Sequence, residues 1–117
     1  TLAVLLGSAG VSWSADFQKG AAAYKSGDYA TALREWTPLT EQGDAFAQGN
    51  LGAMYAFDTG VLKDYVYAHM WGHIAAMNGS ELGGKLRDDF KKQMTPADIF
   101  AAQKLARECV AKNYKGC

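Results

Sequence analysis

The sequence predicts an all-α protein made of stacked antiparallel helical hairpins. Apolar residues recur at helical spacing along most of the chain, and Gly-Asp and Lys-Asp steps interrupt them at intervals of a helix length. The 117 residues include only two prolines, and no convincing alternating strand pattern occurs. With 49% hydrophobic residues, the chain has enough apolar material for the core of one small domain.

The first expected hairpin covers about residues 16–43. Phe17 and Tyr24 belong to a helix that should end at the break 26–28. Asp28 is the expected N-cap of the next helix, which continues through Trp36 and ends before Gly43.

The second expected hairpin covers about residues 44–79. Asp44 can cap a helix that carries Leu51, and the break 58–60 separates it from a second helix. Asp64 should cap that second helix over 65–77, and Asn78 and the following glycine should end it.

Residues 80–117 are expected to form a C-terminal helical cap of two helices. Ser80 opens a short helix that includes Phe90. Thr95 and Asp98 form a capping box around Pro96, which predicts a sharp start for the last helix.

The two hairpins also resemble each other in sequence when residues 20–45 are aligned with 49–81, with a longer inter-helix loop in the second. An internal repeat of this length indicates stacked helical hairpins, neither of which can bury its apolar face alone. The second copy carries an ordered pattern of small, aromatic and capping residues: Leu51, Gly52, Tyr55, Gly60, Asp64, Ala68, Trp71, Ala75, Ala76 and Gly79.

This pattern resembles the Sel-1-like repeat, a relative of the tetratricopeptide repeat. One departure is Asp58, where the family usually has a glycine. The resemblance implies a right-handed helical repeat that binds a protein or peptide, with the first helix of each hairpin on the concave side. Carried over by position, that concave side comprises Phe46, Gly49, Ala53, Ala56 and Phe57. The alternative for the two aromatic residues is packing against the neighbouring hairpin.

The first fifteen residues, TLAVLLGSAGVSWSA, are expected to be the remnant of a secretory signal peptide. They are apolar and small, and they give way abruptly to a polar sequence at Asp16. The run is too short to span a bilayer, so no stable membrane insertion is expected after cleavage. The alternative is an apolar N-terminal element of the folded domain. Export predicts a periplasmic or secreted protein.

The chain has two cysteines, Cys109 and Cys117, and export makes a disulfide between them the simplest expectation. The alternative is two free thiols. The spacing also resembles that of secreted cysteine-rich Sel-1-like proteins, some of which are linked to β-lactam binding or hydrolysis. That resemblance supplies an alternative function, although the chain lacks an S-x-x-K motif.

Both histidines, His69 and His73, lie in one predicted helix at the i, i+4 spacing of many metal ligands. The residues between them are Met70, Trp71 and Gly72, so the glutamate of a metalloprotease motif is absent, and no further histidine can act as a third ligand. We therefore expect no metal site here and interpret the pair as an exposed or inter-repeat feature.

Other motifs of enzymes and nucleotide-binding proteins are also incomplete. GSELGGK at 79–85 satisfies part of a phosphate-binding loop, but Leu86 follows where magnesium binding needs serine or threonine. These glycines fit better with a turn and close helix packing. Twelve basic residues balance twelve acidic ones, so nothing favours nucleic-acid binding. The expectation is a non-catalytic interaction module of the bacterial cell envelope without a cofactor.

Overall fold

The protein is all-helical in the range that its computed structural model describes, residues 15–117. The predicted signal segment lies outside this range except for its last residue. The helices are α2 (Phe17–Lys25), α3 (Tyr29–Glu41), α4 (Ala45–Phe57), α5 (Tyr65–Met77), α6 (Glu81–Lys91) and α7 (Pro96–Ala111). Between residues 15 and 117 there is no β-strand.

Each predicted N-cap accepts a hydrogen bond from the first turn of its helix. These caps are Asp28 before α3, Asp44 before α4, Asp64 before α5, Ser80 before α6 and Thr95 before α7. The capping box at Thr95 is complete, because the Asp98 carboxylate also accepts from the Thr95 N–H. A good N-cap stabilises a helix by about 1 kcal/mol, so these polar residues determine where the helices begin.

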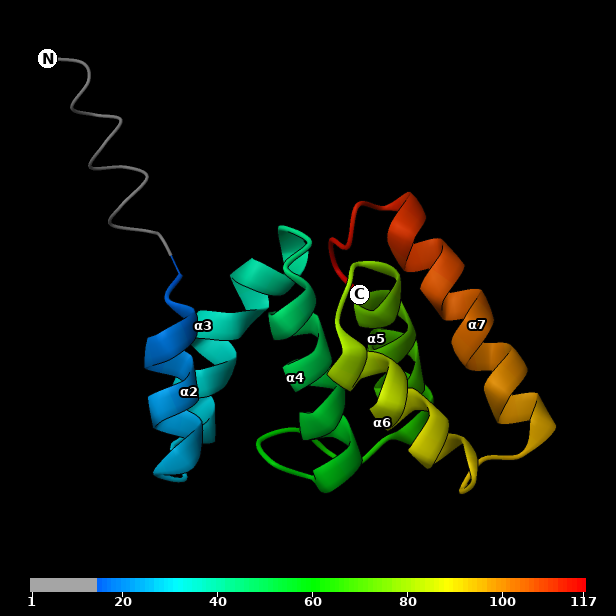
Figure 1. Ribbon diagram of the computed structural model, residues 1–117, viewed down its shortest axis with the longest axis horizontal. Coiled ribbons are helices and arrows are strands. Elements are labelled where there is room, and N and C mark those ends of the chain that lie inside the picture. The colour runs from blue at the N-terminus through cyan, green and yellow to red at the C-terminus, as the bar shows by residue number, and fades with distance from the viewer. Residues whose placement is uncertain (1–14) are drawn as a thin grey trace, which may run out of the picture.

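Neighbouring helices pack side by side in chain order from α2 to α5 (Figure 1). Helices α2 and α3 pack together, as do α4 and α5, and α3 joins the two pairs through its contact with α4. Trp36 is buried between α2, α3 and α4, and Trp71 is buried in the core around α5. The sequence prediction of an all-α fold with packed helical pairs is therefore confirmed.

The last two helices differ from a simple hairpin, because each of them packs mainly against α5 and they make little contact with one another. Gly83 lets the backbone of α6 approach α5 closely, while α7 presents the buried residues Ala102, Ala106 and Cys109. Small residues allow close packing of helices. Helix α5 is consequently surrounded by α4, α6 and α7 (Figure 1).

Two adjacent glycines of α6 give a matched test of this close approach. A Cβ at Gly83 would lie 2.6 Å from the Cβ of Ala75, whereas one at Gly84 would lie 3.4 Å from the Cβ of Ala76, an ordinary contact. We expect Gly83→Ala to destabilise the protein by about 1–3 kcal/mol through overpacking. Gly84→Ala should be neutral or stabilising by up to about 1 kcal/mol, because alanine has the higher helix propensity. Urea unfolding of both variants distinguishes them, and equal stabilities would contradict the close packing of Gly83 on α5.

Candidate binding surfaces

Helix α4 carries all of the residues predicted to line a concave surface, but it divides them between two faces. The side chains of Phe46 and Phe57 are 67% and 56% exposed, and Ala53 is partly exposed. Gly49 and Ala56 are buried. A Cβ at Gly49 would lie 3.2 Å from the Ser80 hydroxyl, so this position is covered by the start of α6 and is not available to a ligand.

The three accessible residues form one stripe along α4. Phe46, Ala53 and Phe57 are separated by seven and four residues, so at 100° per residue they lie within a narrow sector of the helix surface. With a rise of 1.5 Å per residue, the two phenylalanines are about 16 Å apart along the axis. The stripe therefore presents two aromatic rings with a small residue between them.

Each exposed phenylalanine also contacts an aromatic ring of a neighbouring helix. Phe46 meets Phe17 of α2 edge to face at 6.4 Å between ring centroids, and Phe57 meets Phe90 of α6 at 5.8 Å. The alternative interpretation of these residues, packing against neighbouring helices, thus accounts for part of each ring. More than half of each side chain is still open to solvent.

The small residues of the repeat pattern lie where α4 and α5 approach most closely. A Cβ at Gly52 would lie 3.1 Å from the Ala68 carbonyl oxygen and 3.2 Å from the Gly72 nitrogen. Leu51, Trp71 and Ala75 are buried, whereas Ala76 and Tyr55 are partly buried. These residues have structural roles in the described part of the chain and hold α4 in position.

The loop between α4 and α5 explains the unexpected residue at position 58. Asp58 has the left-handed conformation, with φ of 57°, that ends helices and usually favours glycine. Its carboxylate accepts a hydrogen bond from the Lys63 N–H at 3.2 Å, which braces the loop locally. Gly60 follows with φ of 90°, and Gly79 has φ of 106° after α5. An aspartate can therefore replace the glycine typical of the repeat.

The two histidines lie between helices. His69 is only 2% exposed, and its Nδ1 has no hydrogen-bond partner. His73 is partly buried, and its Nδ1 accepts a hydrogen bond from Arg87 of α6 at 3.2 Å. Of the two sequence interpretations, the inter-repeat one fits this arrangement. No group of three or more potential metal ligands occurs among residues 15–117.

The surroundings of His69 lower its pKa to about 4, first through burial and then through the positive neighbours His73, Arg87 and Lys91, with Asp88 acting in the opposite direction. The unfolded chain binds this proton with a pKa of about 6.5, so protonation favours unfolding. We expect stability to be fully present above pH 6.5 and to fall by up to about 1.4 kcal/mol per pH unit down to about pH 4.

The test is the free energy of unfolding of the wild type and His69→Leu measured between pH 7 and pH 4. The wild type should lose more stability than the variant, because the variant has no buried imidazole to protonate. Parallel curves for the two proteins would show that His69 does not contribute to the pH dependence.

The glycine-rich segment 79–85 serves helix packing. Ser80 caps α6, and Gly83 and Gly84 lie within that helix against α5. The segment follows a helix, as the sequence indicated, whereas a phosphate-binding loop follows a strand. The predicted combination of a turn and close helix packing is confirmed.

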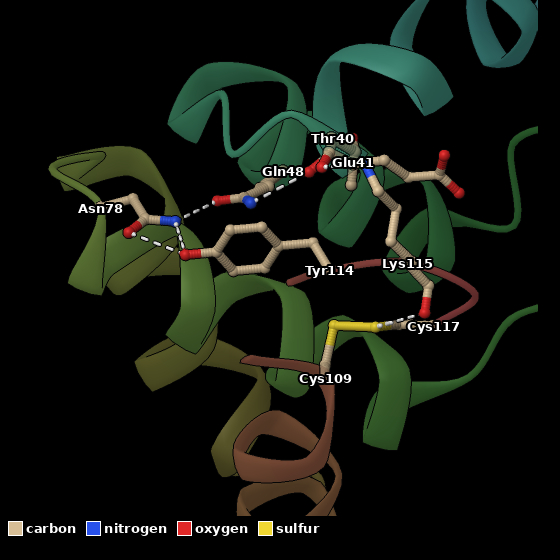
Figure 2. Close-up of a disulfide and its surroundings, with 8 residues drawn as sticks. All are labelled: Thr40, Glu41, Gln48, Asn78, Cys109, Tyr114, Lys115 and Cys117. Carbon is tan, nitrogen blue, oxygen red and sulfur yellow. Dashed lines mark hydrogen bonds between the residues drawn. A yellow bond between two sulfur atoms is a disulfide. The ribbon is translucent and has the colours of Figure 1, made fainter. Parts of the chain in front are cut away.

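The C-terminal tail makes contacts that sequence reasoning did not identify. Cys109 and Cys117 form a disulfide, the pairing expected from the sequence. Figure 2 shows Tyr114 beside the amide of Asn78, which in turn donates to Gln48 at 2.9 Å. The ammonium group of Lys115 donates to the Glu41 carbonyl oxygen at 3.3 Å. These polar residues are far apart in the sequence and follow no motif, so only the three-dimensional structure brings them together.

No protein-family model matches this chain, and no curated protein is significantly similar to it. None of the helices in the described part of the chain has the length and apolarity needed to cross a membrane.

Proposed function

We propose that this protein is a non-catalytic interaction module of the bacterial cell envelope that binds a protein or peptide through the stripe of Phe46, Ala53 and Phe57. The observation that carries the proposal is that two aromatic rings, each more than half exposed, lie on the same face of α4. Aromatic side chains supply much of the binding energy at protein interfaces, because they bury a large apolar area at little entropic cost.

The rigidity of α4 supports this proposal. Its N-terminus is capped by Asp44, whose carboxylate accepts from two backbone N–H groups, and its other side is fixed by close packing of Gly52 against α5. A surface that is already ordered loses little conformational entropy on binding. The spacing of about 16 Å suits an extended or helical peptide with apolar residues at two separated positions.

Membership of the Sel-1-like repeat proteins and export to the periplasm or beyond are parts of the same proposal. The residue pattern from Leu51 to Gly79 supports the first part. The disulfide between Cys109 and Cys117 supports the second, because disulfides persist in oxidising compartments.

The test is a quantitative pull-down from an envelope extract with the wild type, a Phe46→Ser/Phe57→Ser variant and a Leu62→Ser control. Leu62 is 85% exposed in the loop after α4 and lies outside the stripe, so it controls for the loss of surface hydrophobicity. We expect a specific partner to be retained by the control and lost with the double variant.

Retention of the partner by the double variant would show that the stripe is not the binding surface. Recovery of no partner at all would favour a structural spacer. Thermal unfolding of each variant must be compared, since each phenylalanine also touches a neighbouring ring. Hydrolysis of a β-lactam by the purified protein, abolished by changing a defined residue, would contradict the non-catalytic part of the proposal.

A further inference from the structure

A cavity of about 210 Å³ lies on the opposite side of the molecule's central helix from α4, between α5 and α7. Its lining residues are His73 and Met77 of α5 and Ala106, Arg107 and Val110 of α7. The cavity can form here because α6 and α7 each pack on α5 but make little contact with one another. None of the residues predicted from the repeat pattern takes part in it.

The hydrogen bond between Arg87 and His73 determines which nitrogen of His73 carries the proton. A guanidinium group has only donors, so the Nδ1 that receives the Arg87 N–H at 3.2 Å must be unprotonated. Burial and the nearby Arg87 charge also lower the pKa of His73, so its ring is neutral at pH 7. The proton is therefore on Nε2, and this N–H makes no hydrogen bond with any described residue.

Arg107 brings a positive charge to the same cavity. Its guanidinium forms no salt bridge with any residue between 15 and 117, in contrast to Arg87, which pairs with Asp88 at 2.9 Å. No acidic residue lines the cavity. The two polar groups at its wall are thus both donors, one of them charged, and they match the oxygen atoms of an anion.

The rest of the lining is apolar and favours an apolar ligand body. Met77 is 55% exposed and Val110 is 36% exposed, and together with the small Ala106 they leave a surface that water covers at a free-energy cost. A cavity of about 150 Å³ can hold benzene, so this larger one has room for about six to eight carbon atoms. It is smaller than the usual site for a drug-sized ligand.

We propose that this cavity binds a small monocarboxylate with an apolar body of about six to eight carbons. Arg107 and the Nε2–H of His73 hold the carboxylate, and Met77, Ala106 and Val110 contact the apolar part. Arg87 is a positioning residue, because its hydrogen bond to Nδ1 fixes the tautomer that presents the Nε2–H. This site is independent of the α4 stripe, so the two proposals can fail separately.

The experiment is a titration of the full chain with octanoate at pH 7, followed by isothermal calorimetry and by NMR chemical shifts. The neutral analogue octanamide and the Arg107→Gln variant test the role of charge. Arg34→Gln, which replaces an exposed arginine of α3 outside the cavity, is the matched control. Losing one charge-assisted hydrogen bond should weaken binding at least tenfold.

We expect saturable 1:1 binding of octanoate, shifts at Met77 and Val110, and at least tenfold weaker binding both for octanamide and for Arg107→Gln. Arg34→Gln should bind like the wild type. Absence of saturable binding at millimolar octanoate would overturn the proposal. Equal binding of octanoate and octanamide, or unchanged binding by Arg107→Gln, would equally overturn it.

Discussion

Replacing Trp71 with alanine is expected to destabilise the protein by about 3–5 kcal/mol, because it empties a large volume in the middle of the core. Trp71 is 3% exposed and belongs to the core cluster that also contains Leu51, Met70 and Ile74. Truncation removes a large apolar side chain and leaves a cavity beside the backbone of Gly52, which cannot move inwards without breaking the contact between α4 and α5.

Urea unfolding followed by circular dichroism measures this loss. A domain of this size is stable by only about 5–15 kcal/mol, so Trp71→Phe is included as a second variant in case Trp71→Ala leaves too little native protein to measure. The phenylalanine variant keeps most of the ring and should lose clearly less stability than the alanine variant. A loss below about 1 kcal/mol for Trp71→Ala would contradict the central role of this residue in the core.

Removing the disulfide is expected to lower stability by about 2–3 kcal/mol, somewhat less than the loss of Trp71, according to the chain-entropy description of cross-links. The tail that the bond closes is otherwise held by few contacts. Asn113 and Tyr114 both have positive φ, at 54° and 66°, which is unfavourable for residues other than glycine. Without the bond, we expect the tail to leave Asn78 and Glu41 (Figure 2).

The measurement compares unfolding of the wild type with and without reductant, and of a Cys109→Ala/Cys117→Ser variant. Alanine suits position 109 because that residue is 1% exposed in an apolar cluster. The variant should match the reduced wild type and should not respond to reductant. A count of two reactive thiols in the exported protein would show that the bond does not form there.

The sequence predicts the helices well because the signals for their ends are local. Asp64 and Thr95 are polar residues directly before apolar periodic segments, and Gly79 follows one. Such residues act on their own helix whatever surrounds it, so their effect can be inferred without the tertiary structure. The same holds for the close approach at Gly52, which the repeat pattern indicated.

The candidate sites were harder to predict because they depend on which helices cover which faces. His69 is buried because both C-terminal helices pack on α5, and nothing in the sequence around it specifies that arrangement. Gly49 and Phe46 lie on the same helix, yet only Phe46 is exposed, since the start of α6 covers the glycine. The cavity beside Arg107 likewise results from the packing of α6 and α7 against α5.

The central place of α5 also has consequences for how the protein opens. Helix α5 contacts three other helices, whereas the α2–α3 pair is joined to the remainder mainly through α3 and α4. Its remaining links include a Phe17–Phe46 ring contact and a hydrogen bond between the hydroxyls of Tyr24 and Thr59. Partial unfolding should therefore begin with the N-terminal pair while α5 and its neighbours stay folded, so the chain has one strongly cooperative part and one weakly coupled part.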